Sequence, residues 1–518
     1  MATNCKTAGA RNDAASDRVA RADAAADVAR PLHTMPPSSS AGCLFSWGGG
    51  DIARGWHGKS GGAGPSGRVR GVPSDVSLLA ASRNSLAATT DGRIFSWGHN
   101  DSRGGGDAWF VRGGHTASIS DSGQLGRSGS ARAIGLISSG ALGAEGASAL
   151  ASGRYHALAI GRNSHHVYSW GLNDHGQLGR SGWAERRRGG NSGPRECHHG
   201  GRCRDGTPLP VKLKSGGLLN AASIASGRYF SAAVQINTGN VYAWGRCGCG
   251  YGRAIDYAGA QVVEDELSEF NRPPQESDSD VMPATSEASN TGDGDGGGGG
   301  GRGRSSRFGG STPYQIQGSG IEGEQVTSIA AGYTHLLMLT KASLLYSCEC
   351  GDDGYGGRLK TSVQLDAFGQ LGRPGPPLLP LRVRGPSFDE VKPILIAAGR
   401  CASFVVTSSS RGEVYSWGCG QGSGHAPPDR KSPELLNSMS GKGSVRLISA
   451  GEYHAVAAVE GGPILTWGSG AGSVTQPVEV KGLPRHSGRE VVAVGAGYQH
   501  TLVSLSGGAC AGGRAWEL

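Results

Sequence analysis

The sequence predicts an all-β fold, a seven-bladed β-propeller that is closed by pairing of the N- and C-terminal strands and carries disordered insertions. Three observations lead to this prediction. A strand that ends in Trp-Gly recurs along the 518 residues, and a second strand that follows a Gly-x-x-His turn alternates with it. One of the resulting hairpins is divided between the two ends of the repeat region. Radial repetition leaves only short sheet edges, which suits a chain with 92 glycines.

The first motif is a β-branched and aromatic run that ends in Trp-Gly, as in VYSWG at 167–171. This pattern is typical of a strand that enters a tight turn. A seventh copy, LLYSCECG at 344–351, has Cys348 where tryptophan would stand. The indole is large enough to fill the space between neighbouring sheets. The other six copies are marked by Trp47, Trp97, Trp170, Trp244, Trp417 and Trp467.

The second motif has a small residue, glycine, two variable residues and histidine before an apolar run, as in ASGRYHALAI at 151–160. Weaker copies begin at Ala80, Ala225 and Ala397. In six cases a short turn leads on to the next Trp-Gly strand, which is the pattern of a β-hairpin. We expect the motif glycine to allow close packing or a positive φ near the axis. The clear copies have this glycine at Gly153, Gly332, Gly451 and Gly497.

The seventh hairpin is split, with Cys43–Gly48 opening the repeat region and the strand after Gly495 closing it. A linear array would leave both strands unpaired, whereas a ring brings them together. We therefore predict antiparallel pairing of Cys43–Gly48 with a strand near 501–505. The expected domains are a disordered Ala-rich segment at 1–42, the propeller at 43–506 and a C-terminal tail at 507–518.

The pairing of YSWG-x-N-D-x-GQLG with AG-x-x-H-x-x-x-L resembles the repeat of the regulator of chromosome condensation family. The resemblance implies a seven-bladed propeller and a protein-binding function. It also implies an alternative, a guanine-nucleotide exchange factor for a Ran-like small GTPase. The GQLG turn is plain only at 123–126, 176–179 and 369–372. Light sensing by a ring of this kind would need tryptophans in a GWRHT motif, which the chain lacks.

Four inserted loops interrupt the repeats, at 102–121, 183–206, 253–310 and 351–367. Removing 102–121 would join WGHND to SGQLGR without a gap. That loop is either a genuine partner loop or translated non-coding sequence, and the residues leave both open. The segment 264–295 holds ten acidic residues and precedes a glycine tract, so we expect disorder there. Ser277 and Ser279, which lie among its acids, are candidate phosphorylation sites.

The insertion at 183–206 has six arginines against three acids. Guanidinium groups pair bidentately with carboxylates or phosphates. Candidate partner-binding residues are therefore Arg186, Arg187, Arg188 and Arg202, although a solvated loop without a partner fits the same composition.

Catalytic chemistry is not expected from these motifs. The repeated histidines occupy equivalent positions in different blades, so they cannot converge on one reacting atom, and we assign them structural hydrogen bonds. They are His156, His335, His454 and His500. No P-loop, G-x-S-x-G or H-E-x-x-H motif is present. We predict no cofactor and no enzyme activity for covalent chemistry, and leave nucleotide exchange open.

Cysteine usage favours reduced thiols in an intracellular compartment, because the eleven cysteines are odd in number and lack regular spacing. The pairs in CGC at 247–249 and CEC at 348–350 are predicted to be packing residues. No metal site is expected, since Cys197, His198, His199 and Cys203 match no structural zinc spacing well.

Charge and hydropathy limit the partners. The formal net charge of +8 is modest for this length, and the N-terminal segment is not a basic tail. No run of 18 apolar residues occurs. We expect a cytoplasmic or nuclear monomer that binds another protein, a small GTPase being one candidate, without direct nucleic-acid or membrane binding. The predicted function is that of a scaffold whose loops on one face hold the partner.

Overall fold

The computed structural model describes residues 42–48, 67–100, 123–128, 133–173, 175–180, 204–250, 311–318, 320–351, 366–385, 388, 390–409, 412–469, 474–481, 483 and 489–507. All of them lie in the compact unit formed by 1–253 and 308–518. The predicted insertions at 102–121 and 253–310 lie outside the described residues, as do most of 183–206 and 351–367. Strand β10 begins at Arg204, within the last of the positions assigned to the 183–206 loop.

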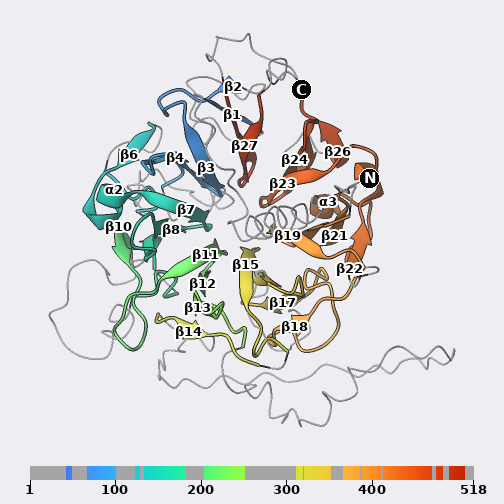
Figure 1. The fold of residues 1–518 in the computed structure, drawn as a ribbon, viewed down its shortest axis with the longest axis horizontal. Coiled ribbons are helices and arrows are strands. Elements are labelled where there is room, and N and C mark those ends of the chain that lie inside the picture. The colour runs from blue at the N-terminus through green and yellow to red at the C-terminus, as the bar shows by residue number, and fades with distance from the viewer. Residues whose placement is uncertain are drawn as a thin grey trace, which may run out of the picture. The chain divides into compact units, whose positions relative to one another are not determined.

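Seven four-stranded antiparallel sheets, which we call blades 1 to 7, form a propeller around a common axis (Figure 1). The predicted fold class is thereby confirmed. Blade 1 contains β3 (Val76–Ala81), β4 (Asn84–Thr89), β5 (Ile94–Gly98) and β6 (Gly135–Ile137), and blade 2 contains β7 (Ala147–Ser152), β8 (His156–Gly161), β9 (Val167–Leu172) and β10 (Arg204–Pro210). Blade 3 contains β11 (Ala221–Ser226), β12 (Phe230–Gln235), β13 (Val241–Gly245) and β14 (Tyr314–Gln315), and blade 4 contains β15 (Val326–Ala331), β16 (His335–Thr340), β17 (Leu345–Glu349) and β18 (Leu381–Arg382).

The remaining blades follow the same order from the axis outward. Blade 5 contains β19 (Pro393–Ala398), β20 (Ala402–Thr407), β21 (Val414–Gly418) and β22 (Arg430–Leu435), and blade 6 contains β23 (Val445–Ala450), β24 (His454–Val459), β25 (Ile464–Gly468) and β26 (Val474–Glu479). Blade 7 contains β27 (Val491–Ala496), β28 (His500–Leu505), β1 (Cys43–Gly48) and β2 (Gly67–Arg68). Short helices are α2 (Gly140–Glu145), α3 (Gly420–Ser423) and the 3₁₀ turn η7 (Asn437–Met439).

Blade 7 closes the ring as predicted. Its third strand, β1, comes from the N-terminal end of the repeats and pairs antiparallel with β28 from the C-terminal end. The register runs from Cys43 opposite Leu505 to Gly48 opposite His500. Closure therefore uses backbone hydrogen bonds between the two ends of the repeat region.

The core lies between blades. Each tryptophan of the repeat is fully buried and packs against the preceding blade, as Trp170 of blade 2 does against Leu86 and Ile137 of blade 1. Because neighbouring blades cover both faces of a sheet, middle strands such as β8 are buried at every position rather than at alternate ones. This is why the repeat strands read as continuous apolar runs.

The last glycine of each GQLG turn makes room for the tryptophan of the next blade. Gly126 and Gly179 have φ of 65° and 67°. A Cβ on Gly126 would lie 2.9 Å from Nε1 of Trp170, and one on Gly179 would lie 2.8 Å from Nε1 of Trp244. Both the positive φ and the close approach exclude a larger residue.

A repeated hydrogen-bond network joins blade 2 to blade 3. Nε2 of His156 lies 2.8 Å from Oγ of Ser231, whose hydroxyl donates to the carbonyl oxygen of Gln177 at 2.8 Å. The same carbonyl accepts the indole N–H of Trp244 at 2.9 Å. The network recurs between blades 4 and 5 with His335, Ser403, Gln370 and Trp417.

These contacts fit the structural role predicted for the histidines. Since Ser231 donates its proton to Gln177, it accepts from His156, which sets the Nε2–H tautomer. Burial lowers the pKa of His156 and of His335 to about 3, so both rings are neutral. His454 and His500 make corresponding bonds to Thr501 and Ser85 in their own next blades.

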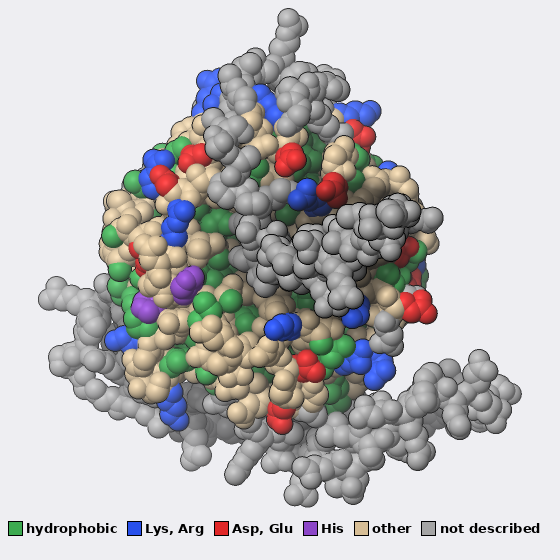
Figure 2. Space-filling view, viewed as in Figure 1, with side chains coloured by type: hydrophobic (Ala, Val, Ile, Leu, Met, Phe, Trp, Pro, Cys, Tyr) green, Lys and Arg blue, Asp and Glu red, His purple; other side chains and the backbone are tan. Residues whose placement is uncertain are grey.

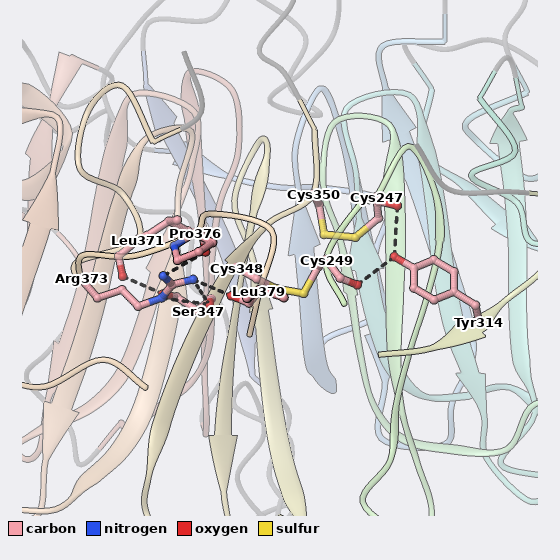
Figure 3. Close-up of a disulfide and its surroundings, with 10 residues drawn as sticks. All are labelled: Cys247, Cys249, Tyr314, Ser347, Cys348, Cys350, Leu371, Arg373, Pro376 and Leu379. Carbon is pink, nitrogen blue, oxygen red and sulfur yellow. Dashed lines mark hydrogen bonds between the residues drawn. A yellow bond between two sulfur atoms is a disulfide. The ribbon is translucent and has the colours of Figure 1, made fainter. Parts of the chain in front are cut away.

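Between blades 3 and 4 every member of this network is replaced. Phe230, Leu336, Gly248 and Cys348 stand where the interfaces between blades 2 and 3 and between blades 4 and 5 have histidine, serine, glutamine and tryptophan. Two disulfides, Cys249–Cys348 and Cys247–Cys350, join the blades instead (Figure 3). We call this pair of bonds the cysteine clamp.

The prediction of reduced packing cysteines is therefore wrong at these positions. The CGC and CEC segments are 99 to 103 residues apart in sequence, yet the ring places them at one interface. A third disulfide, Cys401–Cys419, connects the start of β20 to the end of β21, with its Cα atoms 5.5 Å apart. That separation lies in the ordinary range for a disulfide.

Polar side chains brace the loops beside the clamp (Figure 3). Arg373, which follows GQLG in blade 4, donates to the carbonyl oxygens of Ser347 at 2.8 Å and Leu379 at 2.6 Å. Burial lowers its pKa to about 10. In blade 3 the hydroxyl of Tyr314 donates to the carbonyl oxygens of Cys247 and Cys249, both at 3.1 Å. In blade 3 the outer strand β14 is thereby bonded to the turn after the third strand, and in blade 4 the segment that leads into β18 is.

Among the described residues, no helix has the length and apolar character needed to span a membrane.

Candidate functional site

The loops that join the first and second strands of the blades gather around the axis at one end of the propeller. Backbone bonds connect successive loops: the N–H of Arg154 donates to the carbonyl oxygen of Gly227 at 3.3 Å, and that of Glu452 donates to Gly497 at 3.1 Å. A Cβ on Gly153 would lie 2.6 Å from the same oxygen of Gly227. The motif glycines thus lie where blades approach most closely, and Gly332, Gly451 and Gly497 have equivalent backbone contacts.

These loops present a set of side chains that we call the axial ring. Its members are four cationic side chains, two aromatic ones and a single acid. Four arginines and one glutamate give it three net positive charges. The axial ring consists of Arg83, Arg154, Arg228, Tyr333, Arg400, Glu452 and Tyr498.

Tyr333 is the point at which the arginines converge. The guanidinium carbons of Arg154, Arg228 and Arg400 lie 5.1, 5.6 and 5.7 Å from the centroid of its ring. Arg83 also acts electrostatically on Tyr333. Burial and the nearby Glu452 raise the pKa of Tyr333 well above its ordinary value, so the phenol stays protonated. Cation–π contacts of this kind hold guanidinium groups flat against the aromatic face.

Arg154 and Glu452 come from blades 2 and 6, which are not neighbours, and their Nη1 and Oε1 atoms are 3.9 Å apart. Side chains of non-neighbouring blades therefore meet at the axis on this end of the propeller. Burial alone would lower the pKa of Arg154, but the fields of Tyr333 and Glu452 outweigh it and raise the pKa. The arginine remains charged at all ordinary pH values.

Further aromatic residues flank the ring. Tyr155 and Tyr229 stack with their centroids 5.7 Å apart, and Tyr453 meets the ring member Tyr498 edge to face at 5.6 Å. His175, from the turn of blade 2, lies 4.5 Å from Tyr229. Tyrosine supplies rigid contact area with a polar tip, which is the composition of protein-binding surfaces.

The strands that precede the predicted insertions in sequence end at this same face. Near the ends of the third strands, strand pairing places Gly98, Gly171, Gly245 and Glu349 opposite the first residues of the second strands. Those residues directly follow the loops that carry the axial ring. Each of the four inserted loops follows one of these strands in sequence. A small hollow also opens here between blades 4 and 5, beside Tyr333 and Arg400. We call this end of the propeller the ring face.

Charges elsewhere are mixed. Figure 2 shows lysine, arginine and acidic side chains interspersed over the face in view, without one large patch of a single sign.

The residues predicted to bind a partner or to be phosphorylated lie outside the part of the chain that the structure describes. Arg186, Arg187, Arg188 and Arg202 lie outside the described residues, and so do Ser277 and Ser279. The cysteines and histidines at 197–203 lie outside them as well. Among the described residues, no group of three or more histidine, cysteine or acidic side chains is arranged to hold a metal ion.

Sequence reasoning missed the axial ring. Its signal was present in the two variable positions of the Gly-x-x-His motif, which read Arg-Tyr at 154–155 and at 228–229 and Glu-Tyr at 452–453. In one blade these residues look like ordinary turn residues. Their meaning appears only when seven copies are placed around one axis.

Comparisons with known proteins agree with this architecture. Models of the regulator of chromosome condensation (RCC1) repeat match residues 164–234 and 147–177. The chain is 26% identical to the E3 ubiquitin-protein ligase HERC2 of Homo sapiens over 368 residues, which are 68% of this chain and 6% of that protein. It is 25% identical to the ultraviolet-B receptor UVR8 of Arabidopsis thaliana over 206 residues, 38% of this chain and 43% of the receptor. The chain therefore spans less than half the length of these curated relatives.

Solved structures show the same fold. Prp20p of Saccharomyces cerevisiae, described with its binding to Gsp1p and histones, superposes with a TM-score of 0.58 at 18% identity, over 94% of this chain and 95% of Prp20p. Human WBSCR16 gives 0.55 at 15% identity, over 90% and 99% of the two chains. The resemblance inferred from the motifs is confirmed, and the chain is an RCC1-like seven-bladed propeller.

Proposed function

We propose that this RCC1-like propeller is a protein-binding scaffold that holds a partner protein on its ring face. The observation that carries the proposal is the convergence on one face of a cationic and aromatic ring, a hollow and the ends of the four strands that precede the insertions. Arginine and tyrosine are enriched where proteins bind each other. The scaffold itself performs no covalent chemistry in this proposal, and it acts as a monomer without direct contact to nucleic acid.

A pair of single substitutions tests the choice of face. Tyr229→Glu places a charge on the half-buried aromatic surface beside the ring. Arg446→Glu changes an exposed residue at the far end of β23, where Arg446 pairs with Glu460. Partners that the wild-type chain captures should be lost by Tyr229→Glu and retained by Arg446→Glu. The opposite pattern would place the interface elsewhere.

The alternative function is guanine-nucleotide exchange on a Ran-like small GTPase. The structural similarity to Prp20p, whose binding to Gsp1p is described, is the observation that favours it. An exchange factor must bind the nucleotide-free GTPase more tightly than the loaded form, because only differential affinity drives release. Substoichiometric chain should then accelerate release of a fluorescent guanine nucleotide from the GTPase. Unchanged release leaves the scaffold function as the better account.

The arginine-rich insertion belongs to the same proposal. Replacing Arg186, Arg187 and Arg188 with alanine should weaken capture of an acidic partner, and the loss should diminish as salt rises. If the substituted and wild-type chains capture the partner equally well at every salt concentration, the insertion is not part of the interface.

We further propose an intracellular location, in the cytoplasm or the nucleus. The disulfides among the described residues oppose this location, because such bonds are rare in cytosolic and nuclear proteins. Alkylation and mass measurement of the protein taken directly from cells test the location: free thiols at these positions would support it, and intact disulfides would contradict it.

A further inference from the structure

The axial ring contains guanidinium groups that the described part of the protein does not satisfy. Arg83 is 2% exposed, and its Nε and Nη1 atoms have no hydrogen-bond acceptor among the described residues. Nε of Arg154 is in the same situation. Buried polar groups are nearly always paired, so an orphaned guanidinium indicates an acceptor that comes from outside.

Charge leads to the same conclusion. Glu452 is the one acid of the ring, and it is already opposite Arg154 at 3.9 Å. The guanidinium carbon of Arg83 lies over the faces of Tyr155 and Tyr498, 5.3 and 5.0 Å from their ring centroids. Uncompensated charges held in a buried site are costly, and they persist where a ligand of opposite charge completes the site.

We infer that the axial ring is a binding site for an oxyanion, and that its occupant is a side-chain carboxylate from an acidic segment of the partner protein. The inference rests on the proposed function, which supplies the partner. Arginine matches a carboxylate with two parallel N–H bonds, and the surrounding tyrosines exclude water from those bonds. A phosphoryl group shares this chemistry, and the experiment separates the two sources.

The test measures fluorescence anisotropy of labelled hexaglutamate with the full chain, and uses labelled hexaglutamine as the neutral control. Hexaglutamate should bind and hexaglutamine should not. Arg83→Met should weaken hexaglutamate binding about tenfold or more, the usual effect of removing one member of a close charge pair. Arg446→Gln removes an exposed arginine at the opposite end of β23 and should leave the affinity unchanged.

The melting temperature of the free protein distinguishes a binding role from a structural one. If Arg83 awaits a ligand, Arg83→Met removes an unpaired buried charge and should leave the melting temperature unchanged or raise it. A lower melting temperature would assign Arg83 a structural role and overturn the inference. Arg228→Met gives a second variant in the same ring, for which an equal loss of hexaglutamate affinity is expected.

Two further outcomes separate this inference from the proposed function. If Arg83→Met binds hexaglutamate normally while alanine at Arg186, Arg187 and Arg188 abolishes binding, the ring inference fails but a protein-binding function stands. If a phosphoserine peptide binds at least tenfold tighter than hexaglutamate and inorganic phosphate displaces it, the carboxylate assignment is wrong. Failure of hexaglutamate to bind the wild-type chain would also overturn it.

Discussion

Removing the cysteine clamp should destabilise the propeller more than removing the third disulfide. The perturbation is the double substitution Cys247→Ala with Cys249→Ala, which breaks both bonds of the clamp. The matched control is Cys401→Ala with Cys419→Ala, which breaks a bond within blade 5. Both variants replace two cysteines on a single propeller.

The expected magnitudes follow from the length of chain that each bond closes. A disulfide restricts the unfolded chain by about 4.7 kcal/mol for a loop of about 100 residues, and by about 3 kcal/mol for a loop of about 15 residues. The clamp spans 99 to 103 residues and the control bond spans 18. The second clamp bond adds less, because the first already closes the long loop. We therefore expect losses of about 5 and about 3 kcal/mol in the free energy of unfolding.

The assay is equilibrium unfolding in guanidinium chloride without reductant, followed by tryptophan fluorescence. A reductant should lower the free energy of unfolding of the wild-type protein to the value of the clamp variant or below it. A clamp variant that loses less than about 1 kcal/mol would refute the reasoning, because it would show that the blade 3 to blade 4 interface is held without the bonds. The reasoning would also be refuted if the control variant lost more free energy of unfolding than the clamp variant.

Three other perturbations test the interblade contacts and the closure. Burial lowers the pKa of His156 to about 3, against about 6.5 when unfolded, so the unfolded state binds more protons. The contribution of neutral His156 to the free energy of unfolding should be complete above about pH 6.5 and should decline as the pH falls toward 3. The midpoint of urea unfolding should therefore change less between pH 7 and pH 5 in His156→Phe than in the wild-type protein. Gly179→Ala should cost about 2 kcal/mol or more because a Cβ would meet Trp244, whereas Gly216→Ala, at φ 89° with open space, should cost about 1 kcal/mol by thermal unfolding. Deleting the residues after Gly495 removes the partner of β1, so the melting transition should move for the whole ring rather than for blade 7 alone, and an unchanged melt would contradict closure.

The repeat made the fold predictable from sequence. Each blade is specified locally, by a Gly-x-x-His turn and a Trp-Gly strand that lie close together in the chain. The split hairpin even predicted which strands close the ring, and the observed pairing of Cys43 with Leu505 lies within the expected region. The turn conformation and the burial of each hairpin depend on residues that are close together in the chain, so a single sequence is enough to predict them.

The axial ring and the cysteine clamp were decided by tertiary structure. Arg83 and Arg400 are 317 residues apart and reach one tyrosine only because seven blades return to a common axis. The two cysteine segments carry a partial signal, since Cys348 replaces tryptophan and CGCG replaces GQLG in adjacent units. That signal gains meaning only when blade 3 is known to face blade 4, because a covalent bond depends on distance in space and not on spacing along the chain.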